Sequence, residues 1–475
     1  MSKKFYITTA IPYVNAPPHI GHALEMIQAD VLARYRRTAG DEVFFLTGTD
    51  ENSLKNVQAA EKEGMSIKDF CARNSQIFHD LKEALNLSFD QFIRTTEERH
   101  FAGAQKLWLA CKKEDIYKKK YKGFYCVGCE AFYAARDLMD GKCPEHKTVP
   151  EVVEEENYFF KLSNYQNKLL NLIESDKYKI VPEGRKKEII SFIKMGLEDF
   201  SISRSISRAH GWGVPVPGDE EQIMYVWFDA LSNYITALDY ATNDPLYKKF
   251  WPADMHVIGK GIIRFHAVYW PAMLLSAGLT LPKELFVHGY INVEGEKMSK
   301  SLGNVIDPFE LVGRYGTDAV RYYLLKQINP VEDSDFSIVK FEETYNADLA
   351  NGLGNLAART ANLIEKNFPT NLKIKKSRNQ KNGIDKHIEE YRFDLALKEI
   401  QELITATDQL IDRTKPWALV KTDIKQAEKV LAEAAAQILA IAKALQPFLP
   451  ATAEKIIAQF TAERIVKGES LFPRV

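Results

Sequence analysis

The first 50 residues contain the pattern that most constrains the fold: a strand, a proline-rich loop, an amphipathic helix and a second strand. Residues Lys4–Ala10 are rich in β-branched and aromatic side chains and end before Pro12. Apolar residues then recur at three and four residue spacing over Ile20–Arg37, which predicts a helix. After a turn at Gly40, a second strand is predicted over Glu42–Thr47. Such a unit favours an open parallel sheet, which binds ligands at the carboxyl edge of its strands.

Later segments continue this sheet after an interruption. From about residue 115 the chain changes character, with three adjacent lysines at Lys118–Lys120 followed by closely spaced cysteines and turn residues. Strand-like sequence resumes at Ile223–Phe228, His256–Gly259 and Leu285–Tyr290. Beyond Phe341 apolar residues again recur with a helical period. We therefore predict an α/β chain whose Rossmann-like parallel sheet domain is split by an insertion and followed by an α-helical bundle.

The predicted order is the first half of the sheet domain, the inserted module, the second half of the sheet domain, a connecting unit and the helical domain, at residues 1–114, 115–217, 218–290, 291–345 and 346–475. The formal net charge of −1 gives no broad basic field, so any nucleic acid must be bound by local contacts. The apolar run Phe5–Ile11 is too short and too polar for a secretion signal, and we expect a cytoplasmic protein that does not enter membranes.

Four residues in the insertion have the spacing of a zinc knuckle. Cys126 and Cys129 are separated by two residues, and so are Cys143 and His146. Three thiolates and one imidazole suit tetrahedral structural zinc. A redox C-x-x-C site is the alternative, but no thioredoxin-like strand–helix–strand context surrounds the pair. The sequence therefore predicts one structural Zn²⁺.

Two short motifs are candidates for phosphate chemistry. His19-Ile20-Gly21-His22 starts the predicted helix, where the histidines share a face and the free backbone amides favour phosphate. Gly21 has no side chain, so we expect it to let a nucleobase approach. Lys297 and Lys300 lie in a loop that can close over a triphosphate. Either motif alone is more typical of helix-capping histidines or a solvated basic loop.

Taken together, the two motifs resemble the signatures of class I aminoacyl-tRNA synthetases. The string Phe286–Ile291 before Lys297-Met298-Ser299-Lys300-Ser301, and the run Ala10–Asn15 before the first motif, resemble methionyl-tRNA synthetases in particular. The resemblance covers nearly the whole chain and implies ATP as a substrate, accompanied by Mg²⁺. It implies that His19, His22, Lys297 and Lys300 are catalytic, and that ATP is bound by His19, Gly21, His22, Gly259, Lys260, Lys297 and Lys300.

The same resemblance implies a pocket for methionine, in which aromatic rings surround a flexible thioether. Asp50, at the end of the second predicted strand, is expected to hold the substrate ammonium. The implied methionine-binding residues are Ile11, Tyr13, Asp50, Trp227, Ala230, Leu231, Tyr234, Ile262 and His266.

In the helical domain the resemblance implies that Asn355, Arg359 and Trp417 read the anticodon. Asn and Arg side chains can bond base edges, and Trp can stack on a splayed base. By themselves, an exposed Asn/Arg pair is usually a solvated surface and a lone Trp is usually core. The knuckle is expected to stiffen the insertion that guides the acceptor end of tRNA.

The implied reaction is ligation of methionine to tRNA(Met) with ATP cleaved to AMP and pyrophosphate. Alternatives are another class I synthetase for a small apolar amino acid, a nucleotidyltransferase sharing the first motif, and a catalytically silent tRNA-binding relative. Asn52-Ser53 and Gly261 depart from the family pattern, which usually has His-Gly and Asp there, so ATP handling is where a difference is expected. Because no segment follows the last predicted helices, a monomer is expected.

Overall fold

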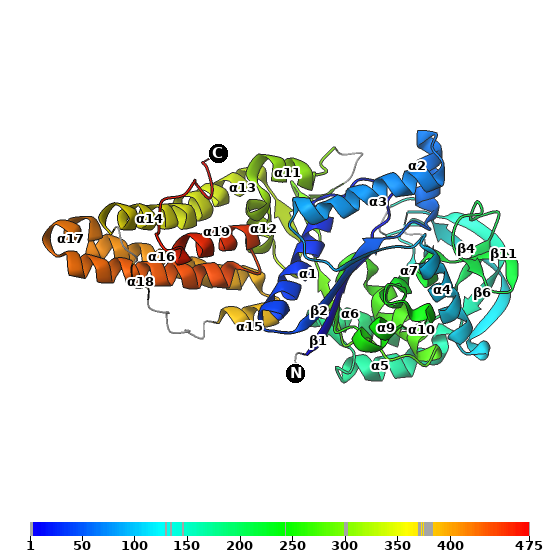
Figure 1. The fold of residues 1–475 in the computed structure, drawn as a ribbon. Coiled ribbons are helices and arrows are strands. Elements are labelled where there is room, and N and C mark those ends of the chain that lie inside the picture. The colour runs from blue at the N-terminus through cyan, green and yellow to red at the C-terminus, as the bar shows by residue number, and fades with distance from the viewer. Residues whose placement is uncertain are drawn as a thin grey trace. The chain divides into compact units, whose positions relative to one another are not determined.

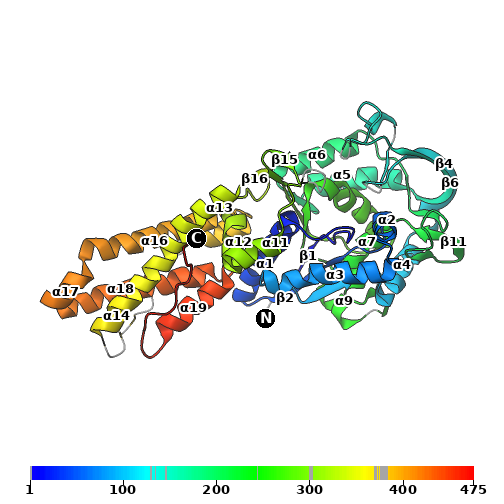
Figure 2. The same ribbon diagram turned by 90° about the horizontal axis from the view of Figure 1, so that it is seen from above.

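The computed structural model describes residues 3–128, 131–133, 135–144, 147–242, 244–298, 303–368, 372, 374 and 383–474. The chain forms two compact units, whose elements are labelled in Figure 1 and seen from above in Figure 2. The first unit comprises residues 1–18, 36–82 and 88–288, and the second comprises residues 19–35, 83–87 and 289–475.

The first unit is built on a parallel sheet. Within the described residues its strands lie in the order β3-β2-β1-β12-β13-β7, and each neighbouring pair is parallel. Their bounds are Gln91–Arg94, Glu42–Thr49, Lys4–Thr9, Met255–Gly259, Glu284–His288 and Lys179–Val181. The carboxyl ends of β1, β2 and β12 therefore meet at one edge, and the predicted Rossmann-like sheet is confirmed.

β1 is an interior strand of this sheet. Its residues Tyr6–Thr9 are buried, as expected for a strand with neighbours on both sides and covered faces. In the first unit the sheet is accompanied by helices, of which α9 contacts β1. The helices with most or all of their residues here are α2 (Leu54–Glu63), α3 (Ile67–Ala84), α4 (Glu98–Ala110), α5 (Gln166–Glu174), α6 (Glu183–Lys194), α7 (Val226–Leu231), α8 (Asn233–Thr236), α9 (Pro245–Phe250) and α10 (Trp270–Ser276).

Residues 115–217 add an antiparallel sheet of the order β5-β4-β6-β8 in the described part of the chain. These strands are Ala131–Tyr133, Ile116–Cys126, Glu151–Phe160 and Phe200–Ser201, and β4 and β6 pair along their length, as Figure 1 shows. One short strand within the same residues, β7, instead pairs with β13 of the parallel sheet. A strand of only three residues is too short to be predicted from its pattern, so this pairing was not expected.

The predicted strand Ile223–Phe228 is wrong. β11 (Asp219–Met224) ends inside it and belongs to a separate antiparallel sheet with β9 (Ser203–Ser205) and β10 (Pro215–Val216). From Val226 the chain is helical, as α7. A short apolar run that is buried on all sides has the same composition in a strand and in a helix, so periodicity cannot separate them.

Most of α1 (Ile20–Thr38) lies in the second unit, close to its predicted bounds. A small sheet of the order β15-β14-β16 follows among the described residues, at Glu296–Lys297, Ile291–Val293 and Ser334–Phe336. Helices α11 (Pro308–Tyr315), α12 (Thr317–Lys326) and α13 (Ile338–Thr344) lead to a π-helical stretch at Tyr345–Gly354.

The remainder of the second unit is the predicted helical bundle. Its helices are α14 (Asn355–Asn367), α15 (Ile384–Glu389), α16 (Phe393–Thr414), α17 (Pro416–Thr422), α18 (Ile424–Leu445) and α19 (Pro450–Thr461). Both views show α16 beside α18, and α18 also packs on α19. No helix in the described part of the chain is long and apolar enough to span a bilayer.

Candidate active site

Two predicted amino-acid-binding residues meet beyond the ends of β1 and β2. The backbone N–H of Asp50 donates to the carbonyl of Pro12 at 2.9 Å, and Tyr13 forms an isolated parallel bridge with Asp50. The Asp50 side chain is 2% exposed, and its Oδ1 accepts bonds from the Asn52 N–H at 3.2 Å and the Thr95 hydroxyl at 3.4 Å. A buried carboxylate is thereby fixed at the carboxyl edge of the sheet.

Aromatic side chains lie near this carboxylate. The Trp227 ring, on α7, meets the edge of Tyr13 at a centroid distance of 6.4 Å. The Trp227 ring also stacks face to face on Phe265, at a centroid distance of 3.8 Å and an interplanar angle of 4°. Ala230 and Leu231 follow on α7 and are buried. The indole Nε1 of Trp227 is buried and has no hydrogen-bond partner among the described residues.

A polar pair completes this group. The Nδ1–H of His266 donates to the carbonyl of Ile262 at 3.0 Å, so Nε2 must accept, and the Tyr234 hydroxyl donates to it at 2.7 Å. Burial lowers the pKa of His266 to about 4, and the imidazole is therefore neutral at neutral pH. In the first unit, Tyr13 thus contacts both Asp50 and Trp227. His266 contacts both Ile262 and Tyr234. Ile11 is half-buried against the same core.

In the second unit the first motif has a defined geometry. The imidazoles of His19 and His22 stack at a centroid distance of 3.9 Å. Nδ1 of His19 accepts from the Gly21 N–H, and Nδ1 of His22 accepts from the His19 N–H, each at 3.1 Å. A ring nitrogen that accepts carries no proton, so each ring is a neutral donor through Nε2–H.

Gly21 is also required by its immediate neighbours. A Cβ built on it would lie 2.8 Å from Cε1 of His19, so a side chain here would displace that ring. The same position would be 3.8 Å from Cε of Met298, in the second motif. The glycine therefore makes room for His19, and the two motifs come close within one unit.

The second motif is described only in part. Lys297 ends β15, whose two residues pair antiparallel with Asn292 and Val293 of β14. Ser299, Lys300 and Ser301 lie outside the described residues. Gly259 ends β12, and Lys260 begins the 3-10 turn at Lys260–Ile262. Gly261, at the centre of this turn, is exposed.

Two of the four predicted zinc ligands can be examined. Cys126 ends β4, and the thiols of Cys126 and Cys143 are both buried. The backbone N–H of Lys147 donates to the Cys143 carbonyl at 2.8 Å. Cys129 and His146 lie outside the described residues, and no group of metal-binding side chains occurs in the rest. Both thiols are thus kept from solvent.

The predicted anticodon readers lie near each other in the second unit. Asn355 begins α14 and is exposed. The guanidinium of Arg359, one turn later, lies over the ring of Trp417 at 4.8 Å from its centroid. Trp417 is 38% exposed at the start of α17, so it is not a core residue. Arg359 is also held by Asp412 at 2.6 Å, a partner that the sequence did not indicate.

Comparison with known proteins identifies the family. Residues 5–149 and 136–361 match the family model of tRNA synthetases class I (M), and residues 374–474 match the anticodon-binding domain of tRNA ligase. The chain is 46% identical to the Methionine--tRNA ligase of Brucella suis biovar 1, covering 96% of this chain and 91% of the relative. It is 42% identical to that of Caldanaerobacter subterraneus subsp. tengcongensis, covering 100% and 79%.

The solved structures agree. Mycobacterium tuberculosis methionyl-tRNA synthetase in complex with methionyl-adenylate superposes with a TM-score of 0.91 and 38% identity, over 100% of this chain and 99% of that one. The chain belongs to the methionyl-tRNA synthetase family.

Some residues near the candidate site were not predicted from the sequence. One is Phe265, which stacks on Trp227. Its place directly before the predicted residue His266 was a signal that could have indicated it. The departure Ser53 caps α2, because its hydroxyl accepts from the Asn56 N–H at 3.2 Å. Asn52, the other departure beside Asp50, is buried and bonds to Asp229.

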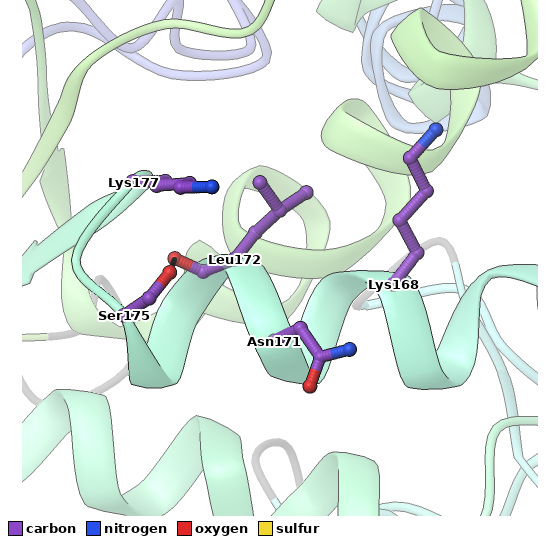
Figure 3. A pocket seen from close by; sticks show the side chains of 5 residues that line it. All are labelled: Lys168, Asn171, Leu172, Ser175 and Lys177. Carbon is purple, nitrogen blue, oxygen red and sulfur yellow. Dashed lines mark hydrogen bonds between the residues drawn. The ribbon is translucent and has the colours of Figure 1, made fainter.

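A shallow hollow elsewhere in the first unit has no candidate residue in its lining. It lies over α5 and is lined by Lys168, Asn171, Leu172, Ser175 and Lys177, as Figure 3 shows. All of these side chains except the half-buried Leu172 are exposed. Exposed lysines without a buried polar partner form an ordinary solvated surface, so the hollow is not part of the site.

Proposed function

We propose that the protein joins methionine to tRNA(Met) in two steps. In the first step a carboxylate oxygen of methionine attacks the α-phosphorus of ATP, which forms methionyl-adenylate and releases pyrophosphate. In the second step the terminal ribose hydroxyl of the tRNA attacks the carbonyl carbon of the adenylate, and AMP leaves. Mg²⁺ enters with ATP as part of the substrate and neutralises its phosphate charge.

The Tyr234–His266 pair is the observation that carries the choice of amino acid. An aromatic pocket that ends in a neutral imidazole and a phenol suits a thioether, which is polarisable and accepts only weak hydrogen bonds. Tyr13, Trp227 and Phe265 supply the aromatic surface. Ile11, Ala230, Leu231 and Ile262 fill the remaining sides in this proposal, and Asp50 binds the substrate ammonium.

For the ATP end we propose roles in stabilising the negative charge of the transition state. The Nε2–H groups of His19 and His22 can donate to phosphate oxygens, since both Nδ1 atoms already accept backbone bonds. Lys297 and Lys300 add positive charge from the loop of the second motif. Gly21, Gly259 and Lys260 are the further residues proposed to bind ATP.

Exchange of radioactive pyrophosphate into ATP tests the proposed activity. We expect exchange that depends on methionine and needs no tRNA, because activation precedes transfer. Leucine, valine and cysteine should each support much less exchange. Equal exchange with one of them would favour the alternative of another class I synthetase, and no exchange with any amino acid would favour a silent tRNA-binding relative.

We propose that Asn355, Arg359 and Trp417 read the anticodon, supported by the stacking of Arg359 on an exposed indole. Trp417→Ala should raise the KM for tRNA, because the variant loses a stacking interaction of about 1–3 kcal/mol with a base. Methionine-dependent exchange should stay unchanged. The measurement is aminoacylation of tRNA(Met) beside exchange on the same preparation. A tRNA with an altered CAU anticodon should be a poor substrate and lose little more with the variant. An equal loss of exchange would remove Trp417 from this role.

One structural zinc is proposed at Cys126, Cys129, Cys143 and His146, where it would hold two turns of the insertion together. Cys143→Ser should release the metal from protein purified without chelator, as measured by elemental analysis. Cys71→Ser is the matched control, since burial raises the pKa of the Cys71 thiol to about 12 and it lies outside the knuckle. Zinc content that is unchanged in the Cys143 variant would refute the site.

We further propose the five domains at residues 1–114, 115–217, 218–290, 291–345 and 346–475, with the insertion guiding the acceptor end of tRNA. A cytoplasmic location and a monomeric state complete the proposal. Light scattering over a range of protein concentrations tests the last of these, and a dimer mass at every concentration would contradict it.

A further inference from the structure

A buried set of hydrogen bonds connects three distant parts of the first unit. Nδ2 of Asn52 donates to Oδ2 of Asp229 at 2.8 Å, and Nε2 of His100 lies 2.6 Å from Oδ1 of the same carboxylate. Asn52 is 7% exposed, and the other two are fully buried. We call Asn52, Asp229 and His100 the buried triad. None of its members was predicted to bind a substrate.

The orientation of the Asn52 amide is fixed by its surroundings. Its nitrogen also donates to the carbonyl of Thr95 at 3.0 Å, so one NH₂ group serves two acceptors. With the amide reversed, an oxygen would face a carboxylate and a carbonyl, which cannot donate. Oδ1 of Asn52 is buried and has no partner in the described part of the chain. Asn52 therefore acts as a double donor.

One end of the buried triad reaches the carboxylate proposed to bind the ammonium. The backbone N–H of Asn52 donates to Oδ1 of Asp50 at 3.2 Å. The other end lies on α7, where Asp229 stands between Trp227 and Ala230 in the chain. Asn52 thus joins the ammonium end of the amino-acid pocket to the helix that forms its side-chain end.

His100 extends this connection to the next helix. Its Nδ1 lies 2.8 Å from the hydroxyl oxygen of Thr236, on α8, which also carries Tyr234. α4, which carries His100, approaches α8 closely: a Cβ on Gly103 would lie 2.4 Å from Cγ2 of Thr236. A glycine is therefore needed for His100 to reach both Asp229 and Thr236.

We infer that the buried triad is a positioning device for methionine. By fixing α7 and α8 against the end of β2, it sets the distance between Asp50 and the pocket that receives the side chain. That distance determines how long an amino acid can be when both of its ends are bound. Asn52, Asp229 and His100 touch no substrate in this account, which rests on the proposed roles of Asp50, Trp227 and Tyr234.

The departure from the family pattern at position 52 is consistent with this role. The histidine that the family usually has at position 52 would carry one N–H in its neutral form, whereas the amide nitrogen of Asn52 carries two. Asn52 can therefore bond to Asp229 and to Thr95 at once, with no added charge beside His100. A change at position 52 should therefore alter the binding of methionine and not the binding of ATP.

The test is Asn52→Asp, which keeps the shape but replaces the double donor with a carboxylate facing Asp229. Repulsion should move α7 away from β2. We expect the KM for methionine in pyrophosphate exchange to rise by about 10- to 100-fold, the usual cost of a small misplacement of bound groups. The KM for ATP should be unchanged, and the Kd for methionine without ATP should rise in parallel.

Asn164→Asp is the matched control. Asn164 also donates its amide to a buried carboxylate, Oδ1 of Asp115 at 3.1 Å, but this pair joins parts of the insertion and α10 instead of the pocket. The control should lower the melting temperature and leave the KM for methionine unchanged. An equal rise in the methionine KM in both variants would mean that Asn52 acts only through stability.

A second substitution restores the pair in reverse. In the Asn52→Asp background, Asp229→Asn places an amide opposite the new carboxylate and still offers an oxygen to His100. Part of the lost methionine affinity should return, since residues in one hydrogen-bond network are coupled. Asn52→Ser, which adds no charge, replaces Asn52→Asp if that variant does not fold, and a smaller rise in the methionine KM is expected.

Amino-acid length supplies a final readout. Exchange with norleucine and ethionine, relative to methionine, should change in the Asn52 variants and stay constant in Asn164→Asp. Unchanged methionine binding in a folded Asn52→Asp protein, or no recovery in the double variant, would overturn the inference. If the unmutated protein shows no methionine-dependent exchange, the proposed function fails, whereas coupling between positions 52 and 229 in thermal unfolding would still be measurable.

Discussion

Asp50→Asn is expected to raise the KM for methionine by about 30-fold or more, because the substrate ammonium loses its only proposed anionic partner. Removing one member of a buried, hydrogen-bonded charge pair costs about 2–5 kcal/mol, and about 1.4 kcal/mol is a factor of ten. The substitution preserves shape, and the two groups that donate to Oδ1, the Asn52 N–H and the Thr95 hydroxyl, can still donate to an amide oxygen. The measurement is pyrophosphate exchange as a function of methionine concentration.

A methionine analogue without the amino group separates this effect from a general disturbance of the site. The deaminated analogue cannot use Asp50, so it should inhibit exchange equally weakly in the unmutated protein and in Asp50→Asn. Asp115→Asn is the structural control, since Asp115 is a buried carboxylate that accepts from Tyr165 and Ser276 in another part of the unit. If the analogue loses as much affinity as methionine does, Asp50 does not bind the ammonium.

The part of the candidate methionine site that follows β1 and β2 could be predicted from the sequence. The β1–α1–β2 pattern places Tyr13 and Asp50 after consecutive strands, and parallel strands end at one edge. The local pattern of strand, helix and strand is therefore enough to predict where these residues lie. The pairing of Trp227 with Tyr13 was implied only by resemblance, because the residues are far apart in the chain and each alone is typical of a core.

The remaining features depend on contacts that no local pattern encodes. The run at Val226–Leu231 is helical, although its composition fits a strand equally well. The buried triad joins positions 52, 100 and 229, and an Asn, a His and an Asp at such distances are unremarkable in a sequence. The ring of His19 above Gly21 likewise depends on side-chain rotamers, which the motif does not specify.

A buried arginine in the second unit supports the second large prediction. Nη2 of Arg321, on α12, lies 2.8 Å from Oδ2 of Asp30, on α1, and both side chains are fully buried. Its guanidinium also donates to the carbonyls of Phe448 at 2.7 Å, Pro447 at 3.0 Å and Leu85 at 3.0 Å. One side chain thus joins the helix of the first motif to the turn that follows α18.

Arg321→Met is expected to lower the free energy of unfolding of the second unit by about 3–5 kcal/mol, because it leaves a buried carboxylate short of a partner. Hydrogen exchange of amides in α1 and α12 measures the loss locally, where a single global transition cannot be assumed for a chain with two units. The control is Arg314→Met, since the Arg314–Glu342 pair at 2.7 Å is exposed and such pairs contribute about 0–1 kcal/mol.

The charge itself can be separated from the packing of Arg321. Adding Asp30→Asn to Arg321→Met removes the buried carboxylate that has lost its Arg321 partner, so amide protection should return in part. The Phe448 and Pro447 carbonyls still lack the donor that Arg321 supplied. Asp30 also pairs with Arg34 at 2.7 Å, which limits the damage in the single variant. Equal exchange rates in Arg321→Met and Arg314→Met would show that the buried pair contributes no more than a surface pair. Slower exchange in the double variant than in Arg321→Met would identify the buried charge of Asp30, without its Arg321 partner, as the main cause of the instability.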